Sequence, residues 1–287
     1  MVGSALRVIL PFLILYFAFK YLGTLGGIAV VVLFILGMVW FNRSIVYQNS
    51  ANAKYHKGDF DGALQDLKKA VEIAPKAAKL RGSLAYLLLK LGFTDEAAFQ
   101  IDKALDCADN ENDRYALRQT KAMVLWKQGK IDEAIEDLEK LLEQYEHTNV
   151  YATLGFLYIE KGDMQKALDF NLKAMDYNSS NAIILDNLGS TYIKLGEYDK
   201  ANEIYQNVMK LKPVFPEAYY NYAHVLEHTG DLEKALYMVR HALSLRFWNV
   251  STVTRDEVEA YQKELEAKVE SQNADTRESN ENTVDEQ

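Results

Sequence analysis

Two hydrophobic patterns divide the chain. Residues 1–43 contain long apolar runs, and Lys20 is the one charged residue between Val8 and Asn42. From residue 44 onward, apolar, small and aromatic residues recur three and four positions apart among charged ones, which is the spacing of amphipathic helices. Leu185–Pro213 shows the second pattern most clearly and predicts two helices that pack closely, joined by a turn at a glycine. The residues carrying this pattern are Leu185, Leu188, Gly189, Tyr192, Gly196, Ala201 and Tyr205.

This helix pair recurs six times. The turn glycines are spaced by 34, 37, 33, 34 and 34 residues, and an alanine stands five residues after each of them. A small residue also stands seven positions before each glycine, where two helices would touch. One pair cannot bury its apolar face alone, so the repetition predicts a solenoid of stacked pairs. The turn glycines are Gly58, Gly92, Gly129, Gly162, Gly196 and Gly230, and the alanines are Ala63, Ala97, Ala134, Ala167, Ala201 and Ala235.

Residues 44–249 resemble six tetratricopeptide repeats. The first-helix pattern of that family is seen in Tyr151-x2-Leu154-Gly155-x2-Tyr158 and in Tyr219-x2-Tyr222-Ala223-x2-Leu226. Arg81 and Arg118 depart from it, because a large apolar residue normally opens a repeat. The resemblance implies an all-α, right-handed superhelix that binds an extended or helical protein segment on the concave face lined by its first helices.

The repeats are expected to end in a covering helix. Thr254 and Glu257 form a capping-box pattern, which predicts a helix from Arg255 to about Glu270. Its apolar face would close the last repeat, as a solenoid requires, so residues 250–270 are assigned to a C-terminal capping helix. Residues 271–287 are polar and acidic and are expected to be disordered. The apolar face comprises Val258, Tyr261, Leu265 and Val269.

Residues 1–43 are predicted to be a transmembrane anchor. Tyr21–Phe41 is long enough to span a bilayer, and Ala5–Leu22 is a marginal span if its flanking Arg7 and Lys20 reach the two surfaces. Glycines between Gly23 and Gly27 favour a turn, which gives a helical hairpin contacting lipid through residues 5–42. Two alternatives stay open: a single span preceded by an interfacial segment, and a cleaved signal peptide.

Charge bears on orientation and on partners. Arg7 and Arg43 would share one side of the membrane with Lys54 and Lys57, against Lys20 on the other, so the repeats are expected to face the cytoplasm. The net charge is −9 and the repeats are acidic, which argues against nucleic acid as a partner. The single cysteine excludes a disulfide framework. No cofactor motif is present, and no cofactor is expected.

The first helices of the repeats supply the residues expected to bind a peptide. A polar row contains asparagines that could hold a peptide backbone. An apolar row edged by lysines would form a groove for an amphipathic or acidic segment, although several of its aromatic residues could instead pack between repeats. The predicted site comprises Asn49, Asn52, Tyr86, Leu89, Lys90, Met123, Trp126, Lys127, Phe156, Ile159, Asn187, Ile193, Lys194 and Asn221.

One motif raises the question of catalysis. His224-Val-Leu-Glu227-His228 matches the zinc-peptidase pattern H-x-x-E-H. It lies inside the first helix of the sixth repeat, in register with five counterparts that carry no metal ligands. Repeat packing therefore explains it better, and no enzyme is expected. The sequence favours a membrane-anchored adaptor or scaffold. The alternatives are a structural subunit that braces a membrane complex through its anchor and, remotely, a metallopeptidase.

Overall fold

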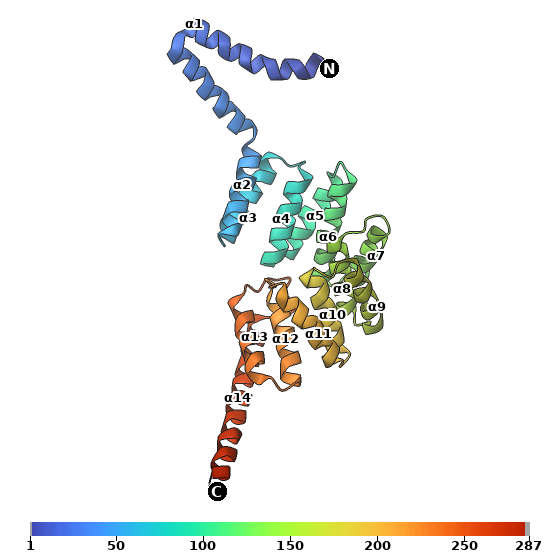
Figure 1. Cartoon of the computed structure of the whole chain (residues 1–287). Coiled ribbons are helices and arrows are strands. Elements are labelled where there is room, and N and C mark those ends of the chain that lie inside the picture. Colours follow the sequence, from blue (N-terminus) through green and yellow to red (C-terminus); the bar gives the residue numbers. More distant parts are fainter. Residues whose placement is uncertain (1, 285–287) are drawn as a thin grey trace. The chain divides into compact units, whose positions relative to one another are not determined.

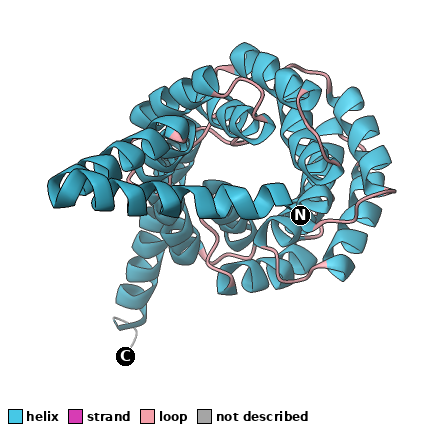
Figure 2. Cartoon of the chain, turned by 90° about the horizontal axis from the view of Figure 1, so that it is seen from above, coloured by secondary structure: helices cyan, strands magenta, loops and turns pink. Residues whose placement is uncertain are grey.

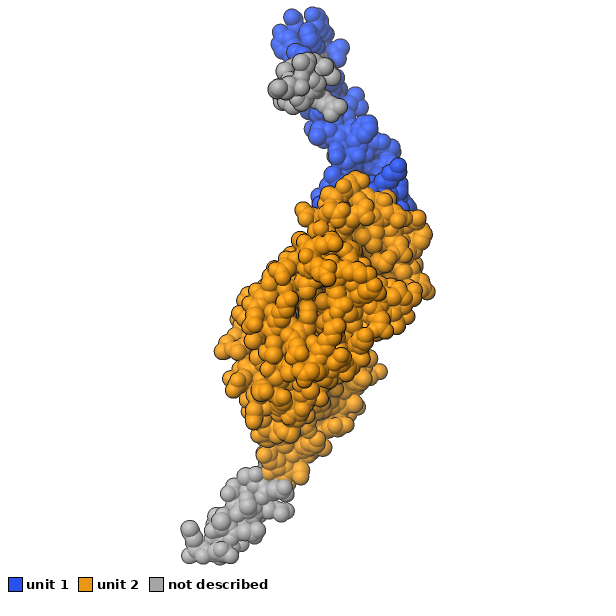
Figure 3. Space-filling model, turned by 90° about the vertical axis from the view of Figure 1, so that its right-hand side faces the viewer, with its two compact units in different colours: residues 1–84 blue, residues 85–287 orange. Residues whose placement is uncertain are grey.

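The computed structural model describes the backbone of residues 2–284, which contain fourteen helices and no strand (Figures 1 and 2). They fall into two compact units, Met1–Leu84 and Ala85–Gln287 (Figure 3), with the boundary inside α4. The helices are α1 (Val2–Phe41), α2 (Arg43–His56), α3 (Phe60–Ile73), α4 (Ala78–Leu91), α5 (Thr94–Asp106), α6 (Glu111–Lys127), α7 (Ile131–Leu142), α8 (Thr148–Lys161), α9 (Met164–Tyr177), α10 (Ala182–Lys194), α11 (Tyr198–Lys210), α12 (Pro216–His228), α13 (Leu232–Ser244) and α14 (Arg255–Val284).

In the first unit, α1 is two helical segments joined at a break. Gly23 has φ 69° and ψ −176°, outside the helical region, whereas the residues on both sides are helical. The break falls in the predicted turn, and glycine adopts it without steric cost. A Cβ on Gly27 would collide with the ring of Phe19, so this glycine lets the two segments approach each other. The side chain of Arg7 lies outside the described residues.

The helices after α1 follow the predicted two-helix repeat. In the first unit α2 packs against α3, and in the second unit the pairs α6–α7, α8–α9, α10–α11 and α12–α13 are in contact. The alanine that follows each turn glycine by five residues is completely buried in all six repeats. Where glycine replaces alanine in the first helix, the approach is closer still. A Cβ on Gly189 would lie 2.6 Å from the ring of Tyr205.

The turns between paired helices require glycine. All six turn glycines have φ between 76° and 94°, the left-handed region that side chains disfavour. Helices α3, α9 and α13, which follow such turns, each begin at an aspartate. Its carboxylate accepts a hydrogen bond from a backbone N–H of the helix's first turn. In these three repeats, glycine and aspartate together therefore set where one helix ends and the next begins. The capping aspartates are Asp59, Asp163 and Asp231.

Arg118, one of the departures from the repeat pattern, is held by an ion pair. Its guanidinium donates to both carboxylate oxygens of Asp137, at 3.0–3.2 Å, and to the backbone carbonyl of the same residue at 2.7 Å. Such forked contacts fix the geometry of the two groups. At this position α6 and α7 are therefore joined by charge.

Helix α14 covers the sixth repeat. The backbone N–H of Thr254 donates to Glu257, and the N–H of Glu257 donates to the Thr254 hydroxyl, so the predicted capping box is formed. The four residues of the predicted apolar face are buried against the core of the last repeats. The helix does not end near Glu270 but continues to Val284, so the part of the expected disordered tail up to Val284 is helical. Residues 271–284 contain no glycine or proline to stop a helix. Residues 285–287 lie outside the described chain.

Candidate peptide-binding surface

Trp126 and Phe156 form an aromatic pair on consecutive first helices, α6 and α8. Their ring centroids are 4.8 Å apart and the rings are perpendicular, an edge-to-face contact. Both side chains are partly exposed. The indole N–H of Trp126 donates to the carboxylate of Glu160 at 3.2 Å. Both rings also pack against the buried core of α6–α9, so the pair is partly exposed while the polar atom of Trp126 is satisfied.

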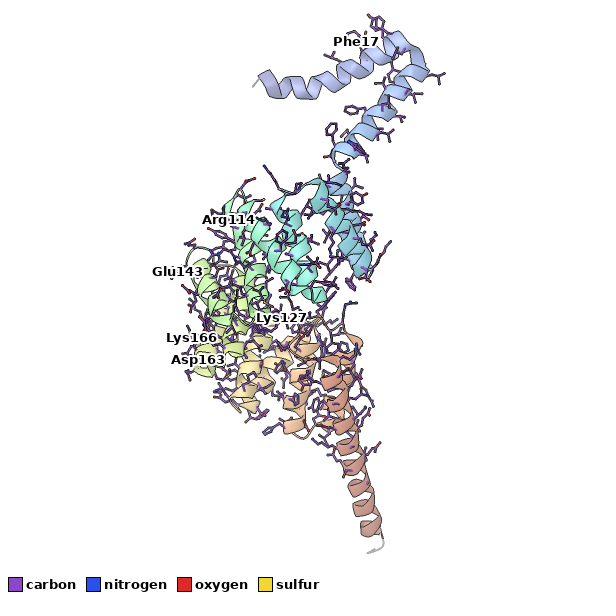
Figure 4. The ribbon with its side chains drawn as sticks, turned by 180° about the vertical axis from the view of Figure 1, so that it is seen from behind. Phe17, Arg114, Lys127, Glu143, Asp163 and Lys166 are labelled. Carbon is purple, nitrogen blue, oxygen red and sulfur yellow. The ribbon has the colours of Figure 1, made fainter. Side chains whose placement is uncertain are left out.

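Lys127, at the C-terminal end of α6 (Figure 4), adds charge to this pair. Its ammonium lies 4.0 Å from the centroid of the Trp126 ring, a cation–π contact. Burial lowers the pKa of Lys127, and the carboxylates of Glu160 and Glu217 act against that shift. The predicted groove was edged by lysines alone. In the structure, acidic side chains accompany the lysine, so both signs of charge border the aromatic pair.

The other predicted residues of the second unit differ in exposure. Tyr86 is 48% exposed, Lys194 is exposed, and Met123, Ile193, Lys90 and Asn221 are half-buried. Leu89 and Ile159 are buried, at 0% and 6% exposure, and so cannot contact a partner. Both follow a more exposed residue, Tyr86 or Phe156, by three positions, whereas Trp126 follows Met123 by the same step and stays partly exposed. This spacing alone therefore does not decide which side chains are accessible.

Asn187 and Asn221 bind within the protein. The Asn187 side chain is 4% exposed and donates to the carbonyl of Ala152 in α8 at 2.8 Å. Asn221 donates to the carboxylate of Asp186 at 3.3 Å. Each bond joins the first helices of adjacent repeats. The polar row therefore acts as a set of inter-repeat clamps in the fifth and sixth repeats, where the sequence predicted contacts to a peptide backbone.

Asp186 is the centre of this buried network. Its carboxylate also accepts the Tyr205 hydroxyl at 2.9 Å. Burial raises the pKa of Asp186 to about 7, although both hydrogen bonds favour the charged form. The sequence pattern did not single out this residue, because an aspartate in a helix is normally solvated.

Asn49 and Asn52 belong to the first unit. Both lie on α2 and are exposed. Their neighbour Ser50 donates to the buried carboxylate of Asp66 at 2.6 Å, and Lys54 pairs with the same carboxylate at 2.7 Å. The polar contacts between α2 and α3 thus use Ser50 and Lys54 and not the two asparagines.

Two residues of the H-x-x-E-H motif, His224 and Glu227, hold α14 in place. The ring of His224 stacks on Tyr261, with centroids 4.1 Å apart, and the Tyr261 hydroxyl donates to Glu227 at 2.7 Å. Lys268 pairs with the same carboxylate. His228 instead stacks on Tyr198 of α11 at 3.7 Å. Within the described residues, no group of three His, Cys, Asp or Glu side chains is placed to hold a metal. The motif is explained by helix packing.

Two contributors to the surface were missed by the sequence analysis. Glu160 stands 34 residues after Trp126, which places it at the equivalent position of the next repeat. The repeat spacing could therefore have identified it. Glu217 approaches Lys127 from the sixth repeat, and no sequence spacing indicates that proximity.

The fold and its glycine-and-alanine contacts define an α-solenoid repeat protein. Two family models described as tetratricopeptide repeat match residues 55–121 and 117–246. The chain belongs to the tetratricopeptide repeat family. A thermophilic TPR protein of Thermus thermophilus has a similar fold: the TM-score is 0.55 at 21% identity, over 66% of this chain and 98% of that one.

Curated relatives are also similar in sequence. BBSome complex member BBS4 of Bos taurus is 31% identical over 105 residues, which are 37% of this chain and 20% of that protein. Photosystem I assembly protein Ycf3 of Prochlorococcus marinus is 26% identical over 171 residues, which are 52% of this chain and 96% of Ycf3. The chain spans about a third or less of the length of the first three curated relatives.

Proposed function

We propose that this protein is a membrane-anchored scaffold that binds a segment of another protein on the surface formed by Trp126, Lys127 and Phe156. The observation that carries the proposal is the partly exposed Trp126–Phe156 pair with Lys127 beside it. Tryptophan residues in well-packed settings dominate the affinity of protein interfaces. Similarity to Ycf3, which is named as an assembly protein, supports a role in assembling other proteins.

The chemistry of the bound segment follows from the surface. The aromatic rings would take apolar side chains, and Lys127 and Glu160 lie close enough to pair with charges on either side of them. An amphipathic segment with apolar anchors and both signs of charge fits this surface better than a purely acidic one. Charge complementarity would then set its orientation and register.

The anchor is α1. Phe19–Phe41 is 23 residues long, with a mean hydropathy of 2.5. Its side chains are largely exposed, including Leu33 at 67% and Trp40 at 66%. The guanidinium of Arg43 lies 4.2 Å from the Trp40 ring, the kind of pair that is favoured where a helix leaves a bilayer. Exposed apolar surface of this extent is costly in water and would be satisfied by lipid.

Two measurements test the proposal. Alkaline extraction of membranes should leave the full chain in the pellet, whereas a Leu33→Lys/Leu36→Lys variant should be released. Tyr237→Lys, on the exposed face of α13, is the matched control and should stay bound. Release of the unaltered chain would contradict the anchor.

For the scaffold, partners co-purified from detergent extracts by the full chain should be lost from Trp126→Ala and kept by Tyr237→Ala. Retention by Trp126→Ala with its fold intact would contradict the binding surface.

A further inference from the structure

The C-terminal end of α4 is occupied by a segment that lies far away in the sequence. The last carbonyls of a helix have no partner within the helix. At α4, the carbonyl of Lys90 accepts the backbone N–H of Asn249 at 3.0 Å, and the carbonyl of Leu89 accepts the Asn249 side chain at 3.1 Å. Asn249 lies at the end of the sixth repeat, in the segment between α13 and α14. One residue thus supplies two donors to the helix end.

Trp248 strengthens the same contact. The ammonium of Lys90 lies 3.8 Å from the centroid of the Trp248 ring, and the guanidinium of Arg246 lies 4.4 Å from it. Cations held against a tryptophan face are attracted by its ring electrons. The Asn249 side chain also lies beside the turn glycine of this repeat, Gly92, where a Cβ would be in ordinary van der Waals contact at 3.7 Å. Aromatic and amide side chains are therefore recognised together.

The occupying segment is shaped in advance. The backbone N–H of Trp248 donates to the Ser251 hydroxyl at 3.2 Å, and the N–H of Ser251 donates back to the Trp248 carbonyl at 2.9 Å. Further along, the N–H of Thr252 donates to Glu217 at 3.1 Å. A turn that is already formed loses less conformational entropy on binding.

We propose that the end of α4 is a binding site for a protein segment in which an aromatic residue precedes an asparagine, and that residues 245–254 occupy it within the chain. The site adjoins the Trp126 surface, because Thr252 of the segment donates to Glu217, whose carboxylate also acts on Lys127. The inference does not depend on the proposed function. A partner segment of the same chemistry reaches the site by displacing residues 245–254. The tethered segment acts at an effective concentration of about millimolar, so a free segment competes poorly until the tethered one is weakened.

A labelled peptide tests this directly. The probe is a fluorescent peptide with the sequence of residues 245–254, titrated into the full chain in detergent and followed by anisotropy. The Trp248→Ala/Asn249→Ala variant, whose own segment is weakened, should bind the peptide at least about tenfold more tightly than the unaltered chain. Adding Lys90→Ala to that variant should weaken binding again. A control peptide carrying alanine at both positions should not bind.

Two results overturn the proposal. One is equal binding of the peptide by the Trp248→Ala/Asn249→Ala variant and the unaltered chain; the other is equal binding of the two peptides by that variant.

A second measurement needs no variant. Hydrogen–deuterium exchange of the unaltered chain should show the Asn249 amide exchanging at least about tenfold more slowly than the Val250 amide, because the first donates to Lys90. Exchange of the Asn249 amide at the rate of an unprotected amide contradicts the occupied site.

Discussion

The indole N–H of Trp126 donates to the carboxylate of Glu160, one repeat further along, with a nitrogen–oxygen distance of 3.2 Å. This bond satisfies the polar edge of the largest side chain on the candidate surface, while its faces contact Phe156 and Lys127. The relation between the two residues gives the surface a fixed shape before any partner arrives. Preformed surfaces lose less entropy on binding.

Trp126→Ala should weaken partner binding by about 2–4 kcal/mol, as expected for a central tryptophan of an interface. Ile159→Ala offers an informative contrast, because that side chain is buried. It should cost about 2–4 kcal/mol of stability through the cavity it leaves, with little direct effect on binding. Calorimetric titration of the identified partner, paired with thermal unfolding of each variant, separates the two effects. The reverse pattern would show that Ile159 is the contact residue.

Asp186 should make stability fall as pH rises. Burial raises its pKa to about 7 in the folded chain, against about 3.9 in an unfolded one. Between these values the folded chain retains a proton that the unfolded chain has released. The contribution of Asp186 to the free energy of unfolding therefore decreases from about pH 4 to pH 7, by up to about 1.4 kcal/mol per pH unit.

The matched variant is Asp186→Asn, whose side-chain oxygen can still accept from Tyr205 and Asn221. It should match the unaltered chain near pH 4 and be more stable above pH 7. Urea unfolding at a series of pH values measures this. An unchanged pH dependence in the variant would assign the titration to other groups.

Gly189→Ala should destabilise the fifth repeat. A Cβ there would lie 2.6 Å from the ring of Tyr205, so the ring or the helix must move. Overpacking of this kind costs about 1–3 kcal/mol, whereas alanine in an open helix position would gain about 1 kcal/mol over glycine. The sign of the change in thermal midpoint therefore reports the packing. Ser190→Ala, next in the same helix, should change little, and stabilisation by Gly189→Ala would refute the close contact.

The break at Gly23 is compatible with a transmembrane hairpin or with a single span after an interfacial segment. The two arrangements differ in the side of the membrane on which the N-terminus lies. Single cysteines at Ser4, Leu25 and Phe41 in a Cys107→Ser background can be labelled in sealed vesicles with an impermeant maleimide. The hairpin predicts that Ser4 and Phe41 react from one side and Leu25 from the other. With a single span, Ser4 and Phe41 would react from opposite sides, and the hairpin would be wrong.

Most of the fold was predictable because repeats average out local ambiguity. The glycines, alanines and apolar residues of each pair mark the same contacts six times, and all six alanines are buried as the pattern requires. The length of α14 was not predicted, because the polar composition of residues 271–284 suggested disorder. The departure at Arg118 was visible in the sequence, but its partner Asp137 was not.

The candidate site was only partly predictable. A residue's position in a helix determines the helix face from which its side chain projects, but not which residues of other helices pack against it. Trp126 and Phe156 are partly exposed but also pack against the core of α6–α9, and Asn187 is a clamp between repeats. The proximity of Glu217 to Lys127 depends on the curvature of the solenoid. So does the contact of Asn249 with the end of α4, across 160 residues. Curvature accumulates from small rotations per repeat and leaves no mark in any one of them.

The central claim is that a protein partner binds at Trp126 while the chain is held in a membrane. Photo-crosslinking from a benzoylphenylalanine placed at position 126 of the full chain in native membranes tests it most directly, with the same group at position 237 as the control. The account predicts one cross-linked partner at position 126, lost when Phe156→Ala is added, and no such product at position 237. Equal cross-linking at both positions, or none at position 126, would contradict it.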